Sequence, residues 1–156
     1  MKPQLVKTWD LRFPCFLERE DENETFAGFC EGAPVFVAGK PSREAALEAL
    51  QEGLAYYLAH LETEGRALPR PPKSAPRKEG LELVWLSPAP VNPVSLEIER
   101  LMKKRGLSRS ELARRLGVAP SAVTRLLDPL YFGHSLKTLR RVAEALECGL
   151  EVRFVA

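Results

Sequence analysis

The stretch SRSELARRLGVAPSAVTRLLD, residues 108–128, has the pattern of two short helices joined by a glycine turn. Ser108-Arg109-Ser110-Glu111 is a capping box, in which the serine hydroxyl and the glutamate carboxylate each satisfy a backbone donor, so it predicts the start of the first helix. Ala113 is small enough for the point where two helices cross, and Gly117, four positions later, suits a turn that needs positive φ. The stretch therefore predicts a helix-turn-helix, whose second helix commonly enters a DNA groove.

Polar residues on the outer side of this unit are the candidates for DNA contact. The apolar residues that would hold the two helices together are Leu112, Leu116, Val118, Val123 and Leu126. The second helix would point Ser121, Thr124 and Arg125 outward, and we expect these to contact DNA bases because hydroxyl and guanidinium groups suit base edges. We expect Arg109, Lys137 and Thr138 to contact phosphates. The alternative is an ordinary helical hairpin in which the same residues face solvent.

Further helices and a strand are predicted around the motif. Asn92 caps a helix that ends at Gly106, and Ser135 begins a helix with Leu136, Leu139, Val142 and Leu146 on its inner side. LEVRFVA, residues 150–156, alternates and predicts a short C-terminal strand. Its apolar residues Leu150, Val152 and Phe154 would leave an unpaired edge, so we expect the strand to contribute to a homodimer.

The region from Val94 onward resembles the Cro-type helix-turn-helix family of repressors, on Ser108 through Ala113, Gly117-Val118, Val123 and Leu126. The resemblance implies binding of operator DNA as a homodimer or higher even-numbered oligomer. One departure is Ala119-Pro120, where the family often has a capping serine or threonine. If Ser121 takes over the capping role, it is less available to contact a base.

The front half predicts the order β-β-β-α-β. Strands are expected within residues 5–16, 24–29, 35–38 and 81–86, and Ser42 caps a helix with Leu47, Leu50, Leu54, Tyr57 and Leu61 along one face. RALPRPPKSAPRKEG, residues 66–80, contains four prolines and five basic residues and predicts an exposed connector.

A second proline-rich stretch, residues 87–93, predicts a domain boundary. We expect a front domain over residues 1–88 and an all-α helix-turn-helix domain over residues 89–156, which together make an α+β protein. The front carries 11 basic and 14 acidic residues, and the back carries 12 and 7. This asymmetry favours a nucleic acid as the partner of the back domain and a basic partner for the front.

The front half resembles the HicB family of antitoxins over about Thr8 to Pro72. The resemblance rests on the order β-β-β-α-β, the acidic hairpin, the run from Gly39 to Ala46 and the segment Leu68-Pro69-Arg70-Pro71. It implies a truncated RNase H-like domain that neutralises a HicA-like, mRNA-cleaving toxin, while the back domain represses the shared operon. The chain has Ala33-Pro34-Val35 where the family often has a proline-glycine-cysteine turn.

Toxin contact is expected at the acidic hairpin, because a basic RNA-cleaving protein is attracted to carboxylates. The candidates are Glu18, Glu20, Asp21, Glu22 and Glu24, and the alternative is that this charged tip is simply solvated.

Two other functions remain open from the sequence. The chain could be a one-component transcriptional regulator whose front domain senses a small molecule. A metal-dependent nuclease would need carboxylates from several strands, whereas Asp10 is the one acid inside the first predicted strand, so we expect no enzyme, no metal and no cofactor. His60 lies on a helix with many exposed positions, and His134 lies in a loop that could touch phosphate. A copurified basic protein, a metabolite or metal-dependent RNA cleavage would separate the three functions.

The cysteine pattern and the hydropathy of the chain indicate the cellular compartment of the protein. Cys15, Cys30 and Cys148 are odd in number and lack C-x-x-C spacing, so we expect them to be reduced and buried. No apolar run has the length of a signal peptide or of a membrane span, which needs about 20 residues. We therefore expect a cytoplasmic protein.

Overall fold

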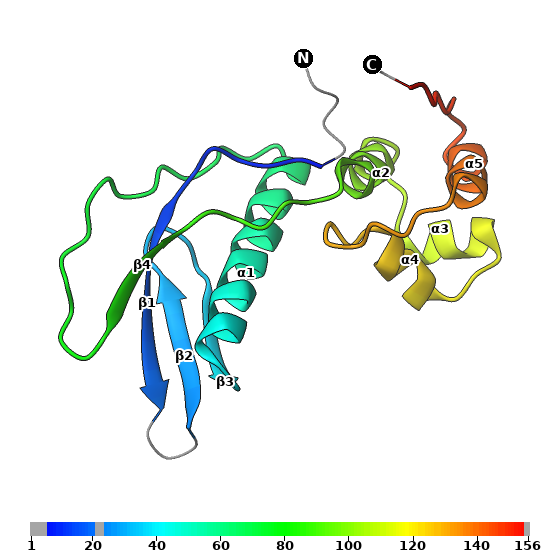
Figure 1. The fold of residues 1–156 in the computed structure, drawn as a ribbon. Helices are drawn as coiled ribbons and strands as arrows, with labels where there is room; N and C mark the ends of the chain where they lie inside the picture. The colour runs from blue at the N-terminus through cyan, green and yellow to red at the C-terminus, as the bar shows by residue number, and fades with distance from the viewer. Residues whose placement is uncertain (1–5, 21–23, 155–156) are drawn as a thin grey trace. The chain divides into compact units, whose positions relative to one another are not determined.

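The computed structural model of the chain describes residues 6–20 and 24–154 (Figure 1). It divides into two compact units. Thr8–Pro90 form one of them, which we call the sheet unit, and Val91–Ala156 together with Met1–Lys7 form the other, which we call the helical unit. Lys7 belongs to the helical unit because it forms an antiparallel bridge with Val91, with N···O distances of 2.8 and 2.9 Å.

The sheet unit has the order β-β-β-α-β, as predicted. Its elements are β1 (Phe13–Glu20), β2 (Thr25–Cys30), β3 (Phe36–Lys40), α1 (Arg43–Thr63) and β4 (Glu82–Leu86). The strands form one antiparallel sheet in the order β3-β2-β1-β4. β1 begins later than the predicted strand and includes the acidic residue Glu18, because pairing with β2 extends the ladder to Glu20 and Thr25.

α1 covers one face of this sheet. Ser42 caps it, its hydroxyl accepting a hydrogen bond from the Ala45 amide at 3.0 Å. The helix buries Ala46, Leu50, Leu54, Ala55, Leu58, Ala59 and Leu61. Gly28 and Gly53 allow α1 to pack closely, because a Cβ at Gly28 would lie 3.2 Å from Leu50 Cδ1 and one at Gly53 would lie 2.6 Å from Val35 Cγ1. The predicted helix face is confirmed for Leu50, Leu54 and Leu61.

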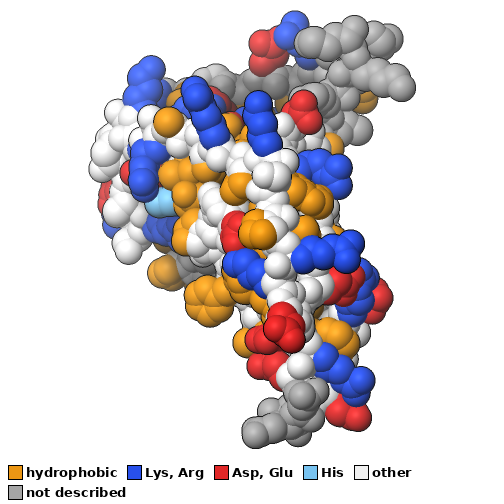
Figure 2. Space-filling view, turned by 90° about the vertical axis from the view of Figure 1, so that its left-hand side faces the viewer, with side chains coloured by type: hydrophobic (Ala, Val, Ile, Leu, Met, Phe, Trp, Pro, Cys, Tyr) orange, Lys and Arg blue, Asp and Glu red, His pale blue; other side chains and the backbone are white. Residues whose placement is uncertain are grey.

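The opposite face of the sheet, which we call the open face, carries aromatic residues. Phe16 and Phe29 stack at 5.4 Å between ring centroids, and Phe36 beside them is 80% exposed. The irregular segment 64–81 runs from α1 to β4, and its Lys78 places Nζ 4.5 Å from the centre of the Phe16 ring. Figure 2 shows hydrophobic side chains exposed between Lys, Arg, Asp and Glu side chains on one side of the molecule.

The expectation of three reduced cysteines is wrong for two of them. Cys15 of β1 and Cys30 of β2 lie directly opposite in the ladder, with their Cα atoms 4.1 Å apart, and form a disulfide. Their separation of 15 residues did not reveal this pairing, since it depends on the register of the hairpin. Cys148 is a free thiol.

The helical unit contains α2 (Pro93–Lys104), α3 (Arg109–Leu116), α4 (Pro120–Leu126) and α5 (Leu136–Ala145). Its core joins all four helices through Ile98, Met102, Leu112, Ala113, Leu116, Val123, Leu126, Leu127, Val142 and Leu146. Asn92 and Ser135 cap α2 and α5 as predicted.

Two details of the prediction for this unit are wrong. Leu136 was expected on the inner side of its helix, but as the first residue of α5 it is 41% exposed. The C-terminal strand is also absent from the described residues, where 148–154 have no regular structure. An extended segment becomes a strand only when a neighbour supplies the ladder hydrogen bonds, and the described part of a single chain supplies none here.

Candidate nucleic-acid interface

α3 and α4 form the predicted helix-turn-helix. Ser108 caps α3 by accepting a hydrogen bond from the Glu111 amide at 3.1 Å. Gly117 ends the helix at φ 63°, ψ 38°, the left-handed conformation that favours glycine. Ala113 is buried, and the Val118 amide donates to its carbonyl at 3.1 Å, which closes the turn into α4.

Only the serine half of the predicted capping box forms, because the Glu111 carboxylate binds two arginines and not the Ser108 amide. This carboxylate accepts hydrogen bonds from Arg114 at 2.6 and 2.9 Å and from Arg115 at 3.1 Å. These bonds lower the pKa of Glu111 to about 2, the bond from Arg114 having the largest effect. Arg115 also donates to the Ala145 carbonyl at 2.9 Å, so this cluster joins α3 to the end of α5.

The three predicted base-contacting residues all lie on the exposed side of α4. Ser121, Thr124 and Arg125 are exposed, while Val123 and Leu126 face the core. Ala119 is the N-cap of α4, and no side chain caps the helix there. Ser121 therefore does not replace the missing cap, and its hydroxyl remains on the outer surface.

The residues predicted to contact phosphate differ in their surroundings. Arg109, at the start of α3, is exposed and lies 4.0 Å from the Glu99 carboxylate. Lys137 is exposed in the first turn of α5. Thr138 is half-buried and its hydroxyl lies 2.9 Å from the hydroxyl of the helix cap Ser135, so part of its hydrogen-bonding capacity is used within the helix.

A hydrogen-bonded clamp holds the loop between α4 and α5. Asn92 Nδ2 donates to the Tyr131 carbonyl at 3.0 Å and lies 3.1 Å from His134 Nδ1. His134 Nε2 lies 2.8 Å from the Leu126 carbonyl oxygen at the end of α4. The suggestion that His134 touches phosphate is thus replaced by a structural role, which fixes the end of α4 against the start of α2.

The loop held by this clamp contains Tyr131, a residue near the interface that the sequence analysis missed. The Tyr131 ring lies 5.9 Å from the guanidinium carbon of Arg125, a cation–π distance. Tyr131 therefore helps to orient the arginine expected to contact a base. The two residues are six positions apart and joined through a loop, so no periodic pattern indicated the contact.

In the sheet unit, the candidate toxin-contacting carboxylates are not equivalent. Glu18 and Glu24 are exposed, and Glu24 lies 3.4 Å from Arg19. The Glu20 carboxylate instead accepts hydrogen bonds from the Thr25 hydroxyl at 2.6 Å and the Gly39 amide at 3.0 Å, which lower its pKa. Asp21 and Glu22 lie outside the described residues.

The described residues also bear on metal binding and membrane insertion. Within residues 6–20 and 24–154, no group of three or more His, Cys, Asp or Glu side chains is placed to hold a metal ion. None of the described helices is long and apolar enough to span a membrane. Asp10 and His60 are both exposed.

Comparison with known proteins gives one family. Residues 97–151 match the Cro/C1-type HTH DNA-binding domain, a range that covers α3 and α4 and most of the helical unit. No curated protein matches the chain. The match assigns a DNA-binding domain to the helical unit, and the chain is accordingly a DNA-binding regulator.

Proposed function

We propose that this chain is the antitoxin of a type II toxin–antitoxin system, in which the helical unit represses the operon and the sheet unit neutralises a HicA-like, mRNA-cleaving toxin. The observation that carries the proposal is the joining, in one chain, of a Cro/C1-type DNA-binding domain to a separate compact β-β-β-α-β unit. Neither unit is assigned a catalytic step, a metal or a cofactor in this function.

The helical unit supports operator binding through its charge and its exposed residues. Val91–Ala156 contain 12 basic and 7 acidic residues, a net charge of +5 that favours association with phosphates. Arg125 on α4 suits a guanine edge, and Arg109 and Lys137 suit the flanking backbone. Operators of this class are usually two-fold symmetric, so the unit acts as a homodimer.

The sheet unit supports binding of a basic protein. Thr8–Pro90 contain 9 basic and 14 acidic residues, a net charge of −5 that opposes nucleic-acid binding and favours a basic partner. The exposed ring of Phe36 on the open face supplies the kind of aromatic anchor that dominates protein interfaces. Glu18 in β1 and Glu24 just before β2 are exposed and supply negative charge on the same sheet.

The test is an RNA-cleavage assay with a purified HicA-like toxin encoded beside this chain's gene. The full chain should suppress cleavage, and the double variant Glu18→Arg, Glu24→Arg should suppress it less at matched concentration, because the new charges repel a basic partner. Glu20 is left unchanged, since its carboxylate holds Thr25 and Gly39. Phe36→Asp should weaken suppression as well.

The matched control is Phe132→Asp, which replaces a half-exposed phenylalanine of the helical unit and should leave suppression intact. Undiminished RNA cleavage in the presence of excess wild-type chain would exclude the antitoxin role. A small molecule that copurifies with the sheet unit and changes operator affinity would instead support a one-component regulator.

A further inference from the structure

The negative charge of the sheet unit is not spread evenly over it. The segment 64–81 carries five basic and two acidic residues, a net charge of +3, whereas the rest of Thr8–Pro90 carries four basic and twelve acidic residues, a net charge of −8. Figure 2 views the side on which Figure 1 draws this segment, and it shows Lys and Arg side chains beside exposed hydrophobic ones. Because salt screens charges beyond about 8 Å at physiological ionic strength, a partner at this segment responds to its local positive charge.

Two contacts with the turn after β2 hold the segment in place. Lys78 Nζ lies 2.6 Å from Glu31 Oε1. Pro72 packs on Gly32, where a Cβ would lie 3.0 Å from Pro72 Cδ. The stretch 73–77 between these two anchors is therefore positioned by the fold although it has no regular secondary structure.

Trp85 borders two hollows that each contain a cation of this stretch. It belongs to β4, the end strand of the sheet, and is half-buried. A shallow hollow joins Trp85 to Lys73 and Arg12, and a second hollow, of about 340 Å³, joins it to Arg77. Arg12 Nη2 also donates to the Trp85 carbonyl at 3.3 Å. We call these four residues the Trp85 surface.

The cations of the Trp85 surface are available to a ligand. In residues 6–20 and 24–154, neither Lys73 nor Arg77 has a carboxylate within ion-pair distance, and both are exposed. Glu82, which lines the second hollow, is held by Arg43, whose Nε lies 2.9 Å from its carboxylate. Asp10, exposed at the first hollow, faces two cations there. The surface consequently has a net positive charge.

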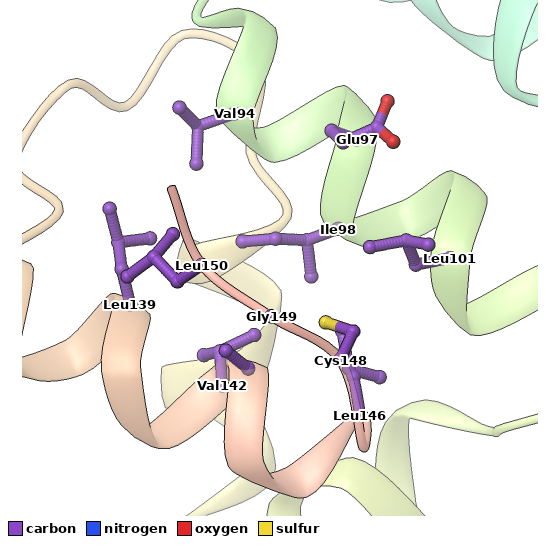
Figure 3. Close-up of a pocket in the computed structure, with 11 residues that line it drawn as sticks. Val94, Glu97, Ile98, Leu101, Leu139, Val142, Leu146, Cys148, Gly149 and Leu150 are labelled. Atoms are coloured by element: carbon purple, nitrogen blue, oxygen red, sulfur yellow. The ribbon is translucent and has the colours of Figure 1, made fainter. Parts of the chain in front are cut away.

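The chemistry of this surface indicates the ligand. The groove of about 400 Å³ between α2 and α5 has Glu97 as the charged member of its described wall, so it does not attract an anion (Figure 3). At Trp85, by contrast, an indole ring lies with exposed cations, the combination that binds single-stranded nucleic acid through base stacking and phosphate contacts. A duplex keeps its bases stacked inside the helix and offers none to the ring.

We propose that the Trp85 surface binds single-stranded RNA, with one base stacked on Trp85 and phosphates on Lys73 and Arg77. Lys73 and Arg77 are four residues apart, so their Cα atoms are at most about 14 Å apart and one short strand reaches both. The choice of RNA rests on the proposed function, which brings the sheet unit to the substrate of an mRNA-cleaving toxin. β3 and β4 are opposite edges of the sheet, so bound RNA leaves Phe36 accessible to a protein partner.

Fluorescence anisotropy of a short labelled oligouridine measures binding to the full chain over a series of salt concentrations. Lys73→Gln, Arg77→Gln removes two phosphate contacts, so it should weaken binding by about tenfold at low salt and reduce the slope of log K against log salt by about 1.4. Arg66→Gln, Arg70→Gln is the matched control. It removes two exposed cations of the same segment that line neither hollow, and it should change the affinity by less than about threefold.

Substitutions of Trp85 test the stacked base. Trp85→Leu keeps an apolar side chain but removes the flat ring, and it should weaken binding by at least about fivefold, whereas Trp85→Phe should retain most of the affinity. RNA should also quench the tryptophan fluorescence of the wild type. It should not quench that of Trp85→Phe, in which the buried Trp9 is the remaining tryptophan. Circular dichroism checks that each variant is folded.

Equal losses in the two double variants would show a general attraction between charges and would overturn the site. Undiminished binding by folded Trp85→Leu would overturn it as well. If Arg109→Gln, Lys137→Gln abolishes oligouridine binding, the RNA binds the helical unit and the proposal is wrong. An aspartate-rich peptide that displaces the oligouridine, and that binds wild type and Trp85→Leu equally, would assign the surface to an acidic protein instead.

These measurements contain no toxin, so they separate this inference from the proposed function. A chain that binds oligouridine at the Trp85 surface but does not suppress RNA cleavage would refute the antitoxin role alone. A chain that suppresses cleavage but does not bind oligouridine would refute the RNA site alone.

Discussion

At Gly53, in the middle of α1, helix propensity and side-chain packing predict opposite effects of a substitution by alanine. A glycine inside a helix usually costs about 1 kcal/mol relative to alanine, so Gly53→Ala is expected from helix propensity alone to stabilise the sheet unit. The Val35 side chain, however, lies 2.6 Å from the position that a Cβ would occupy. We therefore predict that Gly53→Ala lowers the free energy of unfolding by about 1–3 kcal/mol, as overpacking does.

Denaturant unfolding of the full chain, followed through the sheet unit's Trp9 and Trp85, measures this change. Gly149→Ala is the control, because a Cβ there meets no atom within 4 Å and the backbone is not left-handed. Its effect should be small. Stabilisation by Gly53→Ala would show that Val35 can move aside without cost.

Glu111 provides a prediction about pH. Its folded-state pKa of about 2 lies below the usual 4.5 because Arg114 and Arg115 donate hydrogen bonds to its carboxylate. A lowered pKa means that the ionised group stabilises the folded state above pH 4.5 and that this contribution disappears as the pH falls toward 2. The cluster is exposed, so the contribution is small.

The stability difference between the wild type and Glu111→Gln should accordingly be present at neutral pH and shrink in acid. Carbon-13 NMR of the Glu111 carboxyl measures the pKa directly, and Arg114→Ala should raise it. A Glu111 that titrates in the ordinary range in the wild type would contradict the contacts described.

At the scale of the element, α4 is the helix that should decide sequence preference. Arg125→Ala should reduce operator affinity by about 1–3 kcal/mol and relax specificity, because a base contact is lost, whereas Lys137→Ala should weaken all DNA sequences alike and reduce the salt dependence. Binding titrations with operator and scrambled DNA at several salt concentrations separate the two effects. Unchanged operator affinity in the Arg125→Ala variant would show that α4 does not recognise bases through this residue.

The elements also show what could be predicted from the sequence. Ser42, Asn92, Ser108 and Ser135 were correct helix caps, and Gly117 was the correct turn, because capping and positive φ are properties of a few neighbouring residues. The Cys15–Cys30 pairing depends on strand register, and the partners of His134 lie on other helices. Those contacts are set by tertiary structure, which periodicity does not report.

At the scale of the whole molecule, the two units should be separable. The chain in which residues 8–90 are replaced by Asn-Gly should fold and bind operator, since the Lys7–Val91 bridge then becomes the base of a two-residue hairpin. It should no longer protect RNA from the toxin. Circular dichroism and operator titration check the first expectation, and an unfolded product would show that the helical unit depends on the sheet unit.

The Lys7–Val91 bridge has a consequence for how such a protein can arise. Because the two backbone positions are hydrogen-bonded neighbours, Thr8 and Pro90 start and finish the sheet unit next to each other. In genetic terms, residues 8–90 form a cassette whose two junctions coincide in space. In-frame exchange at these two junctions can then replace the sheet unit while the DNA-binding helical unit is inherited unchanged.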